Sequence, residues 1–135
     1  MNKLTPMAGE TALDTSVAIR YLNGDSVVVA RVIALPSIVL PLPVVAELLF
    51  GAENSARSLQ NLTRYLQFIE VCAVVPMGRE TATSYAQTRL TLKRKGRPIP
   101  ENDIWIAAQC LERGWTLATN DEHFNYVDNL IVEHW

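Results

Sequence analysis

Four acidic side chains stand at positions where together they could support chemistry: Asp14, Glu47, Asp103 and Asp121. Asp14 and Asp121 each follow a short apolar run typical of a strand, and Glu47 and Asp103 each fall beside the apolar stripe of a predicted helix. Each acid alone fits an ordinary role, because acids often cap helices or face solvent. Held together, however, four carboxylates repel one another, so their cluster is unfavourable unless a hard cation neutralises it.

The donor atoms of such a cluster indicate which ion it would bind. Carboxylate oxygens suit Mg²⁺ or Mn²⁺, and no Cys/His pattern suited to zinc occurs in the sequence. Ions of this kind keep bound waters, which can be deprotonated to attack a phosphodiester while the metal stabilises the leaving oxygen. The four acids therefore predict phosphodiester hydrolysis with Mg²⁺ or Mn²⁺ and without a protein nucleophile.

The segments that must position these acids alternate between short strands and helices. Strands are predicted at residues 11–13, 37–40, 71–75, 115–118 and 130–132, and helices at 16–22, 44–51, 59–69, 79–95 and from a cap at Asn102 or Asp103 up to Gly114. Helical crossovers between short apolar strands indicate an α/β fold with a mainly parallel sheet covered on both faces. In such a sheet the ligand site lies beyond the carboxyl ends of the strands, where Asp14 and Asp121 are expected.

The whole-chain composition is that of one globular domain. The 135 residues, 49% of them hydrophobic, allow one core and leave no room for a second ordinary domain. Residues 1–10 are polar and contain Pro6 and Gly9, so we expect a flexible arm there and the domain at residues 11–135. No signal peptide or membrane span is evident, and Cys72 and Cys110 lie in apolar surroundings, which predicts a cytoplasmic protein with buried thiols.

Charge is unevenly distributed along the chain. The net charge of −2 argues against a protein that coats nucleic acid nonspecifically. The stretch from Arg79 to Arg97 nevertheless carries six basic residues against one acid, a net of +5, which leaves −7 elsewhere. Lys93, Arg94 and Arg97 either form a solvated helix end or contact an RNA backbone, and the sequence leaves both interpretations open.

Four segments around the acids resemble, in order and spacing, the acidic blocks of the PIN-domain VapC toxins. They are Leu13-Asp14-Thr15-Ser16, Val44 to Ala52, Gly96 to Ala108 and Leu117 to Phe124. One block alone is a weak signal, but all four in order are specific, and the resemblance extends from about Leu13 to Trp135.

The resemblance implies both a fold and a function. The implied fold is a PIN-like three-layer α/β fold with a five-stranded, mainly parallel sheet. The implied activity is a Mg²⁺- or Mn²⁺-dependent endoribonuclease that cleaves a structured RNA such as tRNA or rRNA and is controlled by a VapB-type antitoxin. We also expect a homodimer.

The resemblance also assigns roles to individual residues. Asp14, Glu47 and Asp103 match the first three metal acids of the family and Asp121 the fourth, which varies in the family. The hydroxyls of Ser16, which stands where many members have Asn, and of Thr119 are expected to support the acids rather than to bind the metal.

Other functions fit the residues less well. His123 and His134 lie in no Ser/His/Asp or Cys/His pattern, so His123 is expected only to border the site. Phosphatases with an aspartate nucleophile carry the motif DxDx[TV], but in this sequence Ser16 stands where the second Asp of that motif belongs. A PIN module that binds RNA or protein without cutting, and a housekeeping PIN nuclease without an antitoxin, remain alternatives.

Overall fold

The computed structural model describes residues 5–135, whose centre is a five-stranded sheet in which every strand is parallel to its neighbours. The strands are β1 (Thr11–Leu13), β2 (Val39–Leu40), β3 (Ala73–Val74), β4 (Thr116–Thr119) and β5 (Val132–His134). Their spatial order is β3-β2-β1-β4-β5. The predicted mainly parallel, five-stranded sheet is confirmed.

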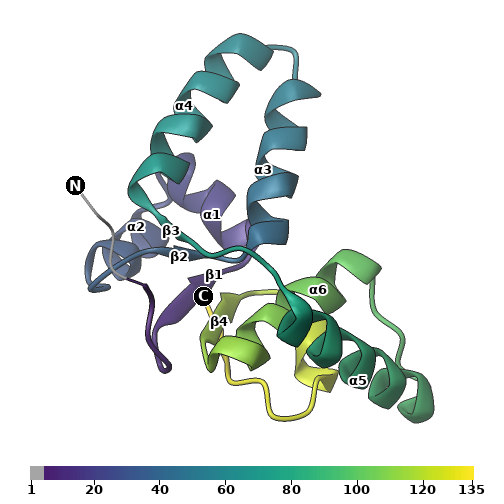
Figure 1. The fold of residues 1–135 in the computed structure, drawn as a ribbon. Helices are drawn as coiled ribbons and strands as arrows, with labels where there is room; N and C mark the ends of the chain where they lie inside the picture. Colours follow the sequence, from purple (N-terminus) through teal and green to yellow (C-terminus); the bar gives the residue numbers. More distant parts are fainter. Residues whose placement is uncertain (1–4) are drawn as a thin grey trace.

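Six helices connect the strands and cover the sheet. They are α1 (Thr15–Leu22), α2 (Ser26–Ile33), α3 (Leu42–Glu53), α4 (Ser58–Val71), α5 (Arg79–Lys95) and α6 (Glu101–Arg113), and a short 3₁₀ helix, η1 (Glu122–Tyr126), precedes β5. The chain moves outward from β1 to β3 and then crosses back to β4 and β5, so right-handed crossovers put α1 to α4 on one face and α5 and α6 on the other. Figure 1 shows the α3–α4 hairpin and the α5–α6 pair on opposite sides of the strands, which gives the predicted three layers.

The core lies on both faces of the sheet around β1 and β4. Leu13 of β1, Leu117 of β4 and Ile106 of α6 are fully buried, as is Phe124 of η1. Ala107 is also fully buried and, being small, allows α6 to pack closely on the sheet. The ends of β1 and β4 and the start of α6 therefore stand on a rigid base.

One helix was not predicted from the sequence. Residues Ser26–Ile33 are rich in valine, which favours strands, yet they form α2. The Asp25 carboxylate caps this helix by accepting hydrogen bonds from the backbone N–H groups of Val27 (3.1 Å) and Val28 (3.2 Å). Val28 and Val32, one turn apart, are buried against the core, so tertiary packing overrides the strand preference.

Several predicted boundaries were wrong. α3 continues past Gly51 to Glu53, because a single glycine weakens a helix without ending it, and β5 starts at Val132, two residues later than expected. α6 begins at Glu101 after Pro100, so neither Asn102 nor Asp103 is its cap. A proline just before the first turn is already suited to start a helix, and the Asp103 side chain is left for another role.

The segment before β1 contacts the domain where the structure describes it. The Gly9 amide donates to the Gly114 carbonyl (2.8 Å), and the Ser37 hydroxyl donates to the Glu10 carboxylate (2.7 Å). Residues 1–4 lie outside the described part of the chain, so the flexible arm at residues 1–10 stays a prediction. Both cysteines are buried, as predicted, and among residues 5–135 no helix is long and apolar enough to cross a membrane.

Candidate active site

Two of the predicted acids meet at the carboxyl ends of neighbouring central strands. Leu13 of β1 is paired with Ala118 of β4, and the Asp14 amide extends this pairing by donating to the Ala118 carbonyl (2.9 Å). Asp121 follows β4 by two residues. The strand order reverses between β1 and β4, since β1 leads to β2 on its other side, and this is where open α/β sheets form ligand sites.

The Thr119 hydroxyl connects these two acids. It donates to Asp14 Oδ2 (2.6 Å) and accepts a hydrogen bond from the backbone N–H of Asp121 (3.0 Å). Asp14, only 6% exposed, also caps α1 by accepting from the Thr15 amide (2.8 Å). Burial raises the pKa of the Asp14 carboxyl, these two hydrogen bonds oppose the rise, and the negative charges of Glu47 and Asp121 add to it.

The other two acids come from helices that approach the same strand ends. Glu47 is half-buried on α3, and its carboxylate accepts a hydrogen bond from the Asn102 side-chain amide at the start of α6. Asp103 lies in the first turn of α6 with a side chain 17% exposed. Burial, followed by the charges of Asp14 and Asp121, raises the pKa of Asp103 to about 6.

All four acids line one pocket of about 410 Å³. The other lining residues are Thr15, Ser16, Ile19 and Asn120. Ser16 donates from its hydroxyl to the Asn120 side-chain carbonyl (3.2 Å). Among residues 5–135, no lysine or arginine lines this pocket. Because the described residues lining the pocket include no strong positive charge and the donors are carboxylates, they fit a hard divalent cation.

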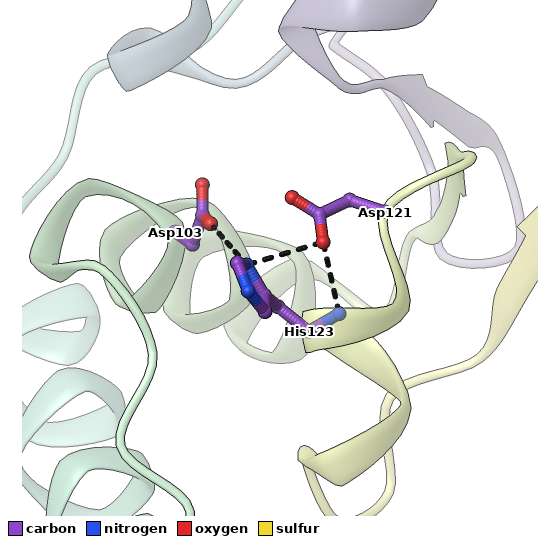
Figure 2. A group of neighbouring side chains, drawn as sticks. All are labelled: Asp103, Asp121 and His123. Carbon is purple, nitrogen blue, oxygen red and sulfur yellow. Dashed lines mark hydrogen bonds and ion pairs between the residues drawn. The ribbon is translucent and has the colours of Figure 1, made fainter.

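The imidazole of His123 also reaches the acids. Figure 2 shows the ring between the Asp103 and Asp121 carboxylates, with Nδ1 3.5 Å from Asp103 Oδ2 and 3.1 Å from Asp121 Oδ1. The His123 amide also donates to Asp121 Oδ1 (2.9 Å), because Asp121 caps η1. His123 therefore borders the site, as predicted, and lies closer to the acids than sequence spacing could indicate.

The sequence did not single out Asn102 and Asn120 as site residues. Both flank a predicted acid in the chain, and that adjacency was the available signal. The predicted basic residues lie outside the acidic pocket. Lys93 lines a neighbouring apolar pocket of about 420 Å³ with Arg89, Leu92, Pro98, Ile99, Glu101 and Ile104, while Arg94 and Arg97 are exposed at the end of α5 and just after it.

Comparison with known proteins agrees with this fold and identifies the family. A family model described as PIN domain matches residues 11–130, so the chain belongs to the PIN domain family. It is 31% identical over 116 residues to the Ribonuclease VapC2 of Rickettsia felis, covering 85% of this chain and 83% of that protein. It is 34% identical over 90 residues to the tRNA(fMet)-specific endonuclease VapC of Shigella flexneri, covering 66% and 68% of the two chains.

Solved structures lead to the same assignment. One similar structure is the crystal structure of VapBC2 from Rickettsia felis bound to a promoter DNA fragment. Its TM-score is 0.87 at 26% sequence identity, and the match covers 93% of this chain and 98% of that chain. Within the PIN family, then, this chain is a ribonuclease toxin of the VapC type. The family predicted from the four acidic blocks is confirmed.

The strain of the acidic cluster should be visible in the stability of Asp103→Asn. The raised pKa means that the folded protein holds this proton more tightly than the unfolded chain does, so the resulting stabilisation is present at low pH and is lost as pH rises through about 6. In EDTA above pH 7 the variant should therefore melt at the same temperature as wild type or a few degrees higher. The difference in melting temperature between the variant and wild type should shrink as pH falls from 6 towards 4.

Metal and activity complete this test. Adding Mn²⁺ should raise the melting temperature of wild type more than that of Asp103→Asn, because ligand binding stabilises only the state that binds, and the variant should lose nearly all RNA cleavage. Glu53→Gln, on the exposed end of α3, is the matched control and should behave as wild type. If Asp103→Asn instead melts well below wild type in EDTA, the side chain serves mainly to stabilise the fold.

Proposed function

We propose that this VapC-type ribonuclease is an endonuclease that cleaves a structured RNA of the tRNA or rRNA class, uses Mg²⁺ or Mn²⁺, and is inhibited by a VapB-type antitoxin. One observation carries the proposal. Asp14, Glu47, Asp103 and Asp121 come from four separate segments and line a single pocket at the carboxyl ends of β1 and β4. The family's use of divalent metals supports the choice of cofactor, as does the lack of a lysine or arginine of residues 5–135 in that pocket.

The four acids are the residues that would hold the ion. When bound, a divalent cation supplies a Lewis acid for the phosphate and lowers the pKa of water. Thr119 fixes Asp14 and the backbone of Asp121, and Asn102 fixes Glu47, so hydrogen bonds orient three of the acids before any RNA arrives. Ser16, bonded to Asn120, borders the same pocket as a further polar support.

The substrate class is inferred from a relative and from the basic residues. The similar Shigella flexneri protein carries the name tRNA(fMet)-specific endonuclease, which supports a tRNA as the target. Lys93 and Arg94 are exposed in the last turn of α5, and the Arg97 guanidinium lies over the Tyr126 ring, 4.8 Å from its centroid. Lys95 differs, because it pairs with Asp128 and donates to the Tyr126 carbonyl and so stabilises the fold. We assign Lys93, Arg94 and Arg97 to contacts with RNA phosphates.

The exposed apolar surface and the acidic pocket indicate which proteins this chain would bind. Phe50 and Leu59, on the α3–α4 hairpin, are 69% and 80% exposed, and Val27 and Ile33 of α2 are also exposed. Large exposed apolar side chains commonly mark protein interfaces. The similar Rickettsia felis structure is a VapBC complex, which supports an antitoxin as one partner of this surface. A second copy of the chain, giving a homodimer, is the other.

The central test is cleavage of RNA by the purified chain. It should cut selected RNA with Mg²⁺ or Mn²⁺ and stop when EDTA is added, and Asp14→Asn should lower the rate by about 100-fold or more. Glu53→Gln should cleave normally. Sequencing of newly formed RNA 5′ ends after expression in cells would identify the target, and cleavage that persists in EDTA would refute the metal mechanism.

The phosphate contacts should be visible in the salt dependence of RNA binding. Replacing Lys93, Arg94 and Arg97 together with Ala should weaken binding and flatten the plot of log affinity against log salt by up to about two to three units of slope. The measurement is a salt titration with catalytically inactive Asp103→Asn, so that the RNA stays intact. Arg57→Ala and Arg79→Ala, at exposed positions, form the control. An unchanged slope would mean that the basic run is only a solvated helix end.

The antitoxin should bind with a basic side chain directed into the acidic pocket and an apolar helix on the exposed surface. The pocket is acidic, so an Arg or Lys of the partner would neutralise it. A coexpressed antitoxin should copurify and inhibit cleavage. Inhibition that is unchanged after neutralising every basic residue near the antitoxin's binding segment would contradict this model.

The homodimer has its own measurement. Light scattering of the isolated chain should give the mass of two copies.

A further inference from the structure

We propose that His123 is a metal ligand, which binds through Nδ1 and makes, with Asp103 and Asp121, a mixed nitrogen and oxygen triad that favours Mn²⁺ over Mg²⁺. The inference rests on the proposed metal-dependent function and refines it. The sequence predicted a site of carboxylates alone, whereas the structure places an imidazole nitrogen beside two of them, Asp103 and Asp121.

The separations between the three side chains are those of ligands to one ion. Nδ1 lies 3.1 Å from Asp121 Oδ1 and 3.5 Å from Asp103 Oδ2, and ligand atoms of all three residues lie within 4.8 Å of one another. Two ligands at about 2.1 Å from an ion and at right angles are about 3.0 Å apart, and at a tetrahedral angle about 3.4 Å apart. Both nitrogen–oxygen distances are therefore close to values that a shared ion would require.

The position of the ring is set by the fold. Asp121 caps η1 through the His123 amide, which holds the two residues together. Phe124, the next residue, is fully buried and anchors η1 to the core. Figure 2 shows the imidazole extending from η1 towards the start of α6, where Asp103 lies. A side chain that only faced solvent would not need to point at two carboxylates.

An ion explains this grouping better than a hydrogen bond alone. Nδ1 can carry one proton, and that proton can point at only one of the two carboxylates with good geometry. A single cation between the three residues would be shared by all of them. It would also neutralise the Asp103 and Asp121 charges, which the protein otherwise leaves close together.

The nitrogen has a consequence for the choice of metal. Mg²⁺ takes oxygen ligands almost exclusively. Mn²⁺ also suits oxygen ligands, but as a first-row transition metal it gains more than Mg²⁺ does from one imidazole nitrogen in the set. Asp14 and Glu47, which line the same pocket, would complete an oxygen-rich set. The imidazole therefore shifts the preference of this oxygen-rich site from Mg²⁺ towards Mn²⁺.

Two histidines in the whole sequence make the inference simple to test. His123→Ala removes the proposed ligand, and His134→Ala is the matched control, since His134 lies on β5 and contacts Asn125 (3.1 Å). Electron spin echo envelope modulation spectroscopy of the Mn²⁺-loaded protein should detect an imidazole nitrogen coupled to the Mn²⁺ electron spin in wild type and in His134→Ala. This coupling should be absent in His123→Ala. Calorimetry should show Mn²⁺ affinity falling by about tenfold or more in His123→Ala, with Mg²⁺ affinity changed by less than about threefold.

The outcomes separate this inference from the proposed function. Circular dichroism and melting in EDTA would first establish that both variants fold as wild type does. If Mn²⁺ binds wild type and supports cleavage without nitrogen coupling, or if the coupling persists in His123→Ala, His123 is not a ligand and only this inference fails. Equal weakening of Mn²⁺ and Mg²⁺ binding also overturns it, because an ion pair would affect both metals alike. If Mn²⁺ does not bind wild type at all, the metal-dependent function fails with it.

Discussion

The pairing of β1 with β4 is the contact on which the site depends. It sets Leu13 beside Ala118, so the residues that follow, Asp14 and Thr119, emerge at the same edge of the sheet. Leu13 and Leu117 are both fully buried and point to opposite faces of the sheet, because Leu13 pairs with Ala118 and Leu117 pairs with Ala12. A shift of one residue in this pairing would move Asp14 away from Thr119 and would disturb the close packing on both faces, which holds the register. Hydrophobic burial in two short strands thus determines where the carboxylates stand.

α6 positions the two remaining acids, Asp103 and Glu47, relative to these strand ends. One side of the helix presents Asp103 to the strand ends, and another presents Gln109, whose side chain is fully buried. Gln109 accepts a hydrogen bond from the Leu42 amide (2.7 Å) and donates one to the Val75 carbonyl (2.9 Å). The helix that supplies Asp103 therefore also holds the start of α3, the helix that supplies Glu47. Asn102 strengthens the same connection by donating directly to the Glu47 carboxylate.

The sequence predicted well the features that depend on hydrophobic periodicity and on the order of strands and helices along the chain. α5 occupies residues 79–95 as expected, and the convergence of four acids follows from the rule that ligand sites form at the carboxyl ends of parallel strands. α2 was missed because its valines favour a strand, and only the Asp25 cap and burial of one face select the helix. The proximity of His123 to Asp103, which lie twenty residues apart in the chain, depends on how η1 turns against α6, and no local pattern in the sequence encodes that angle.

The hydrogen bond between Thr119 and Asp14 has a consequence for how the chain folds. The two residues are 105 positions apart, so the bond closes a loop that includes every helix from α1 to α6. Hairpins such as α3–α4 need only local contacts, whereas a contact of this span has to close a long loop and costs more chain entropy. Local structure alone therefore does not assemble the acidic pocket. The nuclease centre exists only in a chain whose β1 and β4 have paired.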